Sequence, residues 1–195
     1  MLSTQSNPSQ FPGRPAALRS ADSVAFEEVW EASRDRIAVP LRSAIDLRRV
    51  AEFARWFAII EPDLETPALP FRLVGSGFFE FFGHDLTGLD YLTLVDPAIR
   101  QLAYDSVVAC LTQPCGLWQA TPATTADRSS LICEYTILPI SKGGSRADQI
   151  VVYVNFGKPD TGIPVVDRVE HSTVWHWLDI GHGVPRIDLG AFAGA

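Results

Sequence analysis

The sequence predicts an α+β domain in which helices cover one face of a five-stranded antiparallel sheet. Two observations lead to this prediction. Residues 115–156 hold three strand candidates in succession, and two shorter candidates precede them between residues 56 and 75. Segments with helical periodicity lie before and between these groups. Sequential strands usually pair with their neighbours, so this order favours a single antiparallel sheet with helices packed on it.

The N-terminal part of the chain predicts a tail followed by two helices. Residues 1–22 hold prolines and a glycine among serine, glutamine and asparagine, which is typical of a disordered tail. Apolar side chains at helical spacing then predict a short amphipathic helix over residues 24–34. These side chains are Phe26, Val29 and Trp30. A second helix is expected over residues 47–54, with Ser43 or Asp46 as its N-cap.

Two short strands and an aromatic turn come next. Residues 56–61 are a run of large and β-branched side chains, and residues 71–75 alternate in polarity. Because a turn-rich loop separates them, the two runs predict an antiparallel hairpin. The aromatic residues between 78 and 82 indicate a helical turn pressed into the core. Asp96 and Pro97 then mark the start of a longer helix, since aspartate caps well and proline suits the first helical position.

Three further strands complete the expected sheet. Residues 115–121 and 131–140 both have strand character, and the second run alternates clearly. One face of that run consists of Cys133, Tyr135 and Ile137. Residues 150–156 are an unbroken apolar run, which predicts a central strand covered on both faces.

These elements divide the 195 residues into four segments. They are a tail (1–22), an N-terminal helical extension (23–44), a core (45–157) and a C-terminal extension (158–195). A chain of this length buries about 70% of its unfolded surface and so forms a real core. The segment after residue 156 is too short for an output enzyme, so we expect one domain with extensions.

Composition and charge exclude several classes of protein. The formal net charge is −7, and residues 61–195 hold sixteen acidic against eight basic side chains, whereas nucleic acids bind clustered lysine and arginine. No apolar run approaches the ~20 residues that span a bilayer, and the N-terminus lacks the apolar core of a secretory signal. We therefore expect a soluble, cytoplasmic protein without a nucleic-acid or membrane partner. The three cysteines are too sparse for a disulfide framework and are expected to be reduced and mostly buried.

Several short motifs between Val24 and Phe156 resemble one known family in their order and spacing. They are Trp30 with Arg34, Val39–Ser43, Ile45–Asp46, Phe71–Gly77, Phe82–Gly88 and Leu138–Ser141. The set resembles the PAS fold and, more narrowly, a bacterial PAS-like family common in alphaproteobacteria and long catalogued as a domain of unknown function. The resemblance implies a sensory or protein-interaction domain in bacterial signal transduction and no known ligand. The family typically carries arginine where this chain has His84.

A structural interpretation of these motifs is favoured over a ligand-binding one. Gly75 and Gly77 allow tight backbone geometry where the strand meets the aromatic turn. Gly83 and Gly88 bracket a loop whose aspartate or threonine can cap the next turn. That loop contains His84, Asp85 and Thr87. Arg72, on the preceding strand, can pair with a carboxylate across the sheet.

Two chemical alternatives rank below this interpretation. His84 beside Asp85, with Glu134 on a sheet face, offers acid and base groups for a small enzyme, but no Gly-x-Ser-x-Gly elbow, P-loop or metalloprotease motif is present. Three histidines near Asp179 suggest a metal site, but their spacing puts them on no common face of a helix or strand. These histidines are His171, His176 and His182. We therefore predict neither catalytic residues nor a metal.

The resemblance also raises the question of a cofactor, because PAS folds hold haem, flavin or small organic ligands between the sheet and its helices. The chain lacks the Asn-Cys-Arg motif of flavin photosensors, and its histidines lie in one loop or beyond the core, so no chromophore is predicted. Aromatic side chains that can line a pocket are Phe79, Phe82, Tyr104, Trp118 and Tyr135. An unidentified small ligand stays open as an alternative.

Apolar side chains at both ends of the chain indicate contacts outside the five-stranded core. The interface candidates are Phe26, Val29, Trp30, Trp175 and Trp177. They cover either the chain's own sheet or that of a second protomer, and the sequence favours neither. The main expectation is a non-catalytic sensory or interaction module that acts as a homodimer or through a partner such as a histidine kinase or another signalling regulator. A small-molecule sensor is the alternative.

Overall fold

The computed structural model describes residues 19–36, 39–156, 165–172 and 174–186. Its strands are β1 (Phe57–Ile60), β2 (Phe71–Val74), β3 (Gly116–Thr125), β4 (Ser130–Ile140), β5 (Gln149–Asn155), β6 (Val166–Val169) and β7 (Val174–Leu178). Its α-helices are α1 (Ala21–Glu31), α2 (Leu47–Val50), α3 (Ser76–Phe82) and α4 (Arg100–Thr112). Short 3-10 turns lie at Arg42–Ala44, Ala54–Trp56, Tyr91–Leu94 and Pro97–Ile99.

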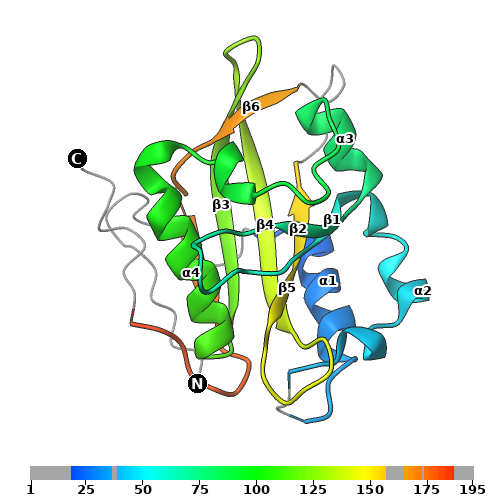
Figure 1. The fold of residues 1–195 in the computed structure, drawn as a ribbon. Coiled ribbons are helices and arrows are strands. Elements are labelled where there is room, and N and C mark those ends of the chain that lie inside the picture. Colours follow the sequence, from blue (N-terminus) through cyan, green and yellow to red (C-terminus); the bar gives the residue numbers. More distant parts are fainter. Residues whose placement is uncertain (1–18, 37–38, 157–164, 173, 187–195) are drawn as a thin grey trace, which may run out of the picture.

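The strands of the described chain form one sheet in the order β2-β1-β5-β4-β3-β6, with β7 also paired to β3 (Figure 1). Every pairing between these strands is antiparallel. The predicted five strands are β1 to β5, and the hairpin of β1 and β2 is confirmed. Two more strands come from the C-terminal segment: β7 pairs with residues 116–120 of β3, and β6 pairs with residues 123–125 on the same edge.

The predicted α+β class is confirmed, but helices cover both faces of the sheet and not one, because α1 packs on the face opposite α3 and α4. Helices α3 and α4 lie in front of the sheet in Figure 1, whereas α1 lies behind it against β4 and β5. Two separate apolar clusters result, one on each face. Strand β5 explains why both faces are apolar: Ile150 and Val152 join the α4-side cluster, and Val151 and Tyr153 join the α1-side cluster. The prediction of a central strand covered on both faces is therefore confirmed.

Helix α1 begins three residues earlier than the sequence pattern predicts. The Ser20 hydroxyl accepts a hydrogen bond from the Ser23 amide (3.1 Å), which caps the helix and draws Ala21 and Asp22 out of the predicted tail. Residues 1–18 of that tail lie outside the described residues. The Trp30 indole donates to the Pro139 carbonyl (2.9 Å), so the helix is attached to β4 by a buried hydrogen bond.

Two further helix predictions differ in outcome. Asp46 caps α2 as expected, since its carboxylate accepts from the Arg48 amide (2.9 Å), but the helix ends at Val50 and not at residue 54. The reason is that Phe53 is the next buried side chain, and the chain turns there to enter β1. Asp96 and Pro97 begin a helical turn as expected, since the Asp96 carboxylate accepts from the Ala98 amide (2.9 Å) and Pro97 is its first residue. That turn is the 3-10 turn Pro97–Ile99, and α4 itself begins after it at Arg100.

Candidate functional site

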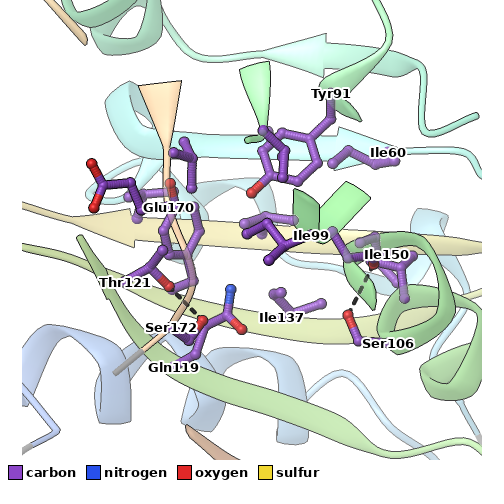
Figure 2. A pocket seen from close by; sticks show the side chains of 18 of the residues that line it. Ile60, Tyr91, Ile99, Ser106, Gln119, Thr121, Ile137, Ile150, Glu170 and Ser172 are labelled. Atoms are coloured by element: carbon purple, nitrogen blue, oxygen red, sulfur yellow. Dashed lines mark hydrogen bonds between the residues drawn. The ribbon is translucent and has the colours of Figure 1, made fainter. Parts of the chain in front are cut away.

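A cavity of about 70 Å³ lies between the sheet and the helices α3 and α4. Most of its wall is apolar. Figure 2 shows Ile60, Ile99, Ile137 and Ile150 around one end of this space. These residues come from β1, the turn before α4, β4 and β5. The cavity therefore occupies the region where the two layers of the fold meet, which is a common place for a small-molecule site.

The other end of the cavity is polar. Gln119 and Thr121 of β3 line it together with Ser172, which follows β6 (Figure 2). The hydroxyls of Thr121 and Ser172 share one hydrogen bond (2.8 Å). The Gln119 carboxamide makes no hydrogen bond to any residue that the structure describes. In the described chain, the polar end thus has two hydroxyls that are bonded to each other and one side-chain amide, that of Gln119, without a hydrogen-bond partner.

The titratable groups of the described wall are two tyrosines, Glu170 and His171. No lysine or arginine in the described chain lines it. Burial raises the pKa of Tyr91 and of Tyr135, whose side chains contact each other, so both phenols are neutral at physiological pH. Glu170 lines the wall as well, and its carboxylate accepts a hydrogen bond from the Thr124 hydroxyl. The titratable side chains of the described wall are therefore two neutral tyrosines, His171, and Glu170, whose carboxylate already has a partner.

A family model for the PAS domain matches residues 18–152 of the chain. The chain belongs to the PAS domain family. The match confirms the resemblance drawn from the motifs. No curated protein matches the chain.

Several solved structures are similar to this PAS domain. A light-oxygen-voltage domain studied with a flavin analogue is 16% identical, covers 58% of this chain and 85% of its own, and gives a TM-score of 0.45. A light-oxygen-voltage protein of Rhodobacter sphaeroides is 14% identical, with coverages of 57% and 65% and a TM-score of 0.43. The PAS domain of a protein from Colwellia psychrerythraea is 14% identical, with coverages of 57% and 96% and a TM-score of 0.42. No ligand of this PAS domain follows from such distant likenesses.

Two of the five aromatic pocket candidates of the PAS domain, Phe82 and Tyr135, line the cavity. The other three do not. Phe79 is 58% exposed on the outer side of α3, and the Tyr104 hydroxyl donates to the Asp63 carbonyl (2.9 Å). Trp118 points to the opposite face of the sheet, where its indole donates to the Glu134 carboxylate (2.6 Å). The physical reason is strand alternation: Gln119 and Trp118 are neighbours on β3 and must face opposite sides.

The motif residues of the PAS domain have structural roles. Gly75 is required by a close approach, because a Cβ there would lie 2.1 Å from the Ala54 carbonyl oxygen. Gly83 and Gly88 have positive φ angles (77° and 81°) and terminate turns. The rest of the loop is held locally: the Asp85 carboxylate accepts from the Thr87 amide (2.9 Å), and His84 Nδ1 lies 2.9 Å from the Phe82 carbonyl oxygen. Arg72 pairs with Glu61 (3.3 Å), as the sequence suggested.

The structure does not bring together the three residues of the enzyme alternative. Glu134 faces the α1 side of the sheet, where it accepts from the Ser20 amide (2.9 Å) and the Trp118 indole. His84 and Asp85 lie in the loop after α3, on the other side. In the part of the chain that the structure describes, these three side chains line no common cleft and none of them lines the cavity.

The interface candidates of the PAS domain are all buried within its own fold. Phe26, Val29 and Trp30 pack on the sheet below α1, each with 5% exposure or less. Trp175 and Trp177, on β7, are 4% exposed in the cluster on the α4 side. Of the two alternatives that the sequence leaves open, the structure shows these side chains covering the chain's own sheet. The reason for Trp175 and Trp177 is that β7 pairs with β3 and brings both indoles into the core.

Histidines and cysteines of the PAS domain are spread over different surroundings. Among the described residues, no three metal-binding side chains come together. His171 is part of the cavity wall, His182 is exposed, and His176 is buried against Trp118 with ring centroids 5.4 Å apart. The three cysteines are free thiols and, as predicted, buried.

No helix in the described ranges has the length and apolar character that crossing a bilayer requires.

We expect His176 to make the PAS domain less stable in mild acid. Burial, with the positive charge of Arg19 nearby, lowers the pKa of His176 below its ordinary value. The unfolded chain therefore takes up this proton at a higher pH than the folded chain does. Stability conferred by the neutral imidazole is present above about pH 6.5, the ordinary histidine value, and is lost as pH falls toward the lower folded value.

Urea unfolding at several pH values checks this expectation. His176→Leu should flatten the decline of the unfolding free energy below about pH 6.5. The exposed residue His182 provides the control, and His182→Gln should leave the decline unchanged. If the unfolding free energy of His176→Leu declines with falling pH as steeply as that of the natural chain, the expectation is contradicted.

Proposed function

We propose that this PAS domain is a non-catalytic sensory module in signal transduction and that a small molecule in the cavity is its signal. The observation that supports this most is the cavity itself, which combines an apolar wall with a polar end formed by Gln119, Thr121 and Ser172. Sensory domains of this fold place ligands between the sheet and its helices, and the cavity occupies that position. The structure thus favours the small-molecule alternative over a module that only binds proteins.

The cavity's volume indicates the size of the ligand. An engineered cavity of ~150 Å³ holds a benzene-sized molecule, and the cavity here is about 70 Å³. A flavin or a haem would need large movements of the aromatic side chains that close the space, Phe78, Phe81 and Phe82. The proposed signal is therefore a molecule of a few heavy atoms and not a chromophore.

The signal must reach another protein. We propose as its recipient a second copy of the chain, or a partner such as a histidine kinase or another signalling regulator. Membership of the PAS domain family supports this step. Light scattering of the full chain tests the homodimer: a dimer mass supports the second copy, and a monomer excludes it.

Native mass spectrometry of the purified protein tests the ligand. We expect a stoichiometric small molecule bound to the natural chain. Ala103 of α4 lines the cavity, so Ala103→Leu should fill it and abolish this binding. Ala98 is exposed in the turn before α4, so Ala98→Leu should retain the ligand. Circular dichroism confirms that both variants are folded. A natural chain without bound molecule, together with no uptake from a cell extract, contradicts the proposed function.

A further inference from the structure

Two polar side chains that face the α4 side of the sheet lack partners within the described chain. Gln119 of β3 and Trp175 of β7 are directly opposite in the ladder, so both project from the same face. Trp175 is 4% exposed, and its indole nitrogen has no hydrogen-bond partner among the described residues. Buried polar groups in folded proteins are nearly always hydrogen-bonded. Trp175 is not part of the cavity wall, but Gln119, half-buried on the same face, lines the cavity with a carboxamide that can bond a polar molecule.

The polar groups at this end of the cavity have the donors and acceptors that bind an amide ligand. A carboxamide presents two N–H donors and one carbonyl acceptor, so Gln119 can bond a ligand that has both an acceptor and a donor. The hydroxyl pair of Thr121 and Ser172 uses one of its two hydrogens internally and keeps the other for a ligand. Figure 2 shows these three side chains at the same end of the cavity.

The charge of the wall selects against ions. An anion would lose its hydration without meeting a lysine or arginine in the described wall. Tyr91 and Tyr135 stay neutral, so an anionic ligand would meet the like charge of Glu170. His171 is the one side chain of the described wall that can carry a positive charge, so the butyrate arm of the test below decides its influence. The opposite end of the cavity is formed mainly by isoleucines, with Ser106 beside Ile150, whose hydroxyl already donates to the Ala103 carbonyl, so this end suits a short alkyl chain.

We propose that the cavity selects a small neutral amide with a short apolar chain, and that Gln119 is the residue that determines this selectivity. The inference rests on the proposed function, because it names a ligand class for the same cavity. A site that is built to hydrogen-bond its ligand rejects isosteres that lack the matching group, since the site's own polar atoms then stay unpaired.

Three isosteres with the same propyl chain separate the contribution of the amide N–H group from those of charge and of the alkyl chain. They are butyramide, the anion butyrate and the ketone 2-pentanone. Each is titrated into the nitrogen-15-labelled full chain, and the backbone amide signals of β3 and β4 are followed by NMR. We expect butyramide to shift signals around Gln119 and to bind about tenfold more tightly than either isostere. Gln119→Leu should weaken butyramide about tenfold and leave 2-pentanone unchanged.

Gln119→Leu replaces an unpartnered polar group by an apolar one, so its melting temperature should not fall. Thr121→Val is a second variant that also weakens butyramide. Gln101, exposed on α4, provides the matched control, and Gln101→Leu should still bind butyramide more tightly than butyrate or 2-pentanone. Equal binding of all three compounds, tightest binding of butyrate, or no effect of Gln119→Leu would each overturn the inference and leave the proposed function standing. If no compound shifts any signal of the cavity wall, both proposals fail.

Discussion

Replacing Trp30 with alanine is expected to lower the free energy of unfolding by about 3–5 kcal/mol, which is the usual cost of truncating a buried tryptophan. Trp30 is 2% exposed and lies in the apolar cluster between α1 and the sheet. The change also removes the hydrogen bond from the indole to the Pro139 carbonyl and leaves that buried acceptor unpaired. Arg34, whose guanidinium lies 5.0 Å from the indole centroid, loses its stacking contact as well.

Equilibrium unfolding in urea measures this change, and two variants refine it. Trp30→Phe keeps most of the apolar contact and should lose only about 1–3 kcal/mol, mainly from the unpaired carbonyl. Val24 lies on the same helix but is 40% exposed, so Val24→Ala should change stability by less than about 1 kcal/mol. If Trp30→Ala costs no more than Val24→Ala does, α1 is not packed on its own sheet in solution.

Gly75→Ala is expected to destabilise the domain by about 3 kcal/mol, the upper part of the range for overpacking. The added Cβ would lie 2.1 Å from the Ala54 carbonyl oxygen and 2.5 Å from that of Arg55. Both contacts are with backbone, so no side chain can rotate away. The start of α3 has to move, and α3 carries Phe78, Phe81 and Phe82 of the cavity wall.

The matched control is Gly143, which lies in the turn between β4 and β5, where a Cβ would meet no atom within 4 Å. Gly143→Ala should leave the free energy of unfolding within about 0.5 kcal/mol of the natural value. Thermal and urea unfolding of both variants give the comparison. A Gly75 variant as stable as the Gly143 variant shows that the two segments do not approach each other as closely as the fold requires.

Much of the fold could be predicted because local chemistry fixes it. The Asp96–Pro97 helix start, the alternation of β4 and the doubly covered β5 all depend on residues close together in the chain. The length of α2 could not be predicted, since the burial of Phe53 against a distant sheet decides where the chain turns. Strand β6 was missed for a similar reason: four residues with two exposed positions become a strand only by pairing with β3.

The site was less predictable than the fold. Alternation shows that Gln119 and Thr121 share one face of a strand and Trp118 the other, but it does not tell which face borders a cavity. The sequence therefore favours Trp118 as a pocket residue, whereas in the structure Gln119 and Thr121 line the wall. The contact between Thr121 and Ser172 joins residues 51 positions apart, so only the arrangement of β6 beside β3 reveals it.

The shared edge of β3 has a practical consequence for anyone who produces this protein in pieces. The family match ends at residue 152, before β6 and β7 begin. That boundary lies inside β5, and even a fragment that keeps β5 and ends at residue 156 would leave a ten-residue strand with an open row of amide and carbonyl groups and would uncover apolar core beneath Trp175 and Trp177. Open strand edges of this kind invite pairing between molecules, so the trimmed fragment should aggregate where the longer chain does not.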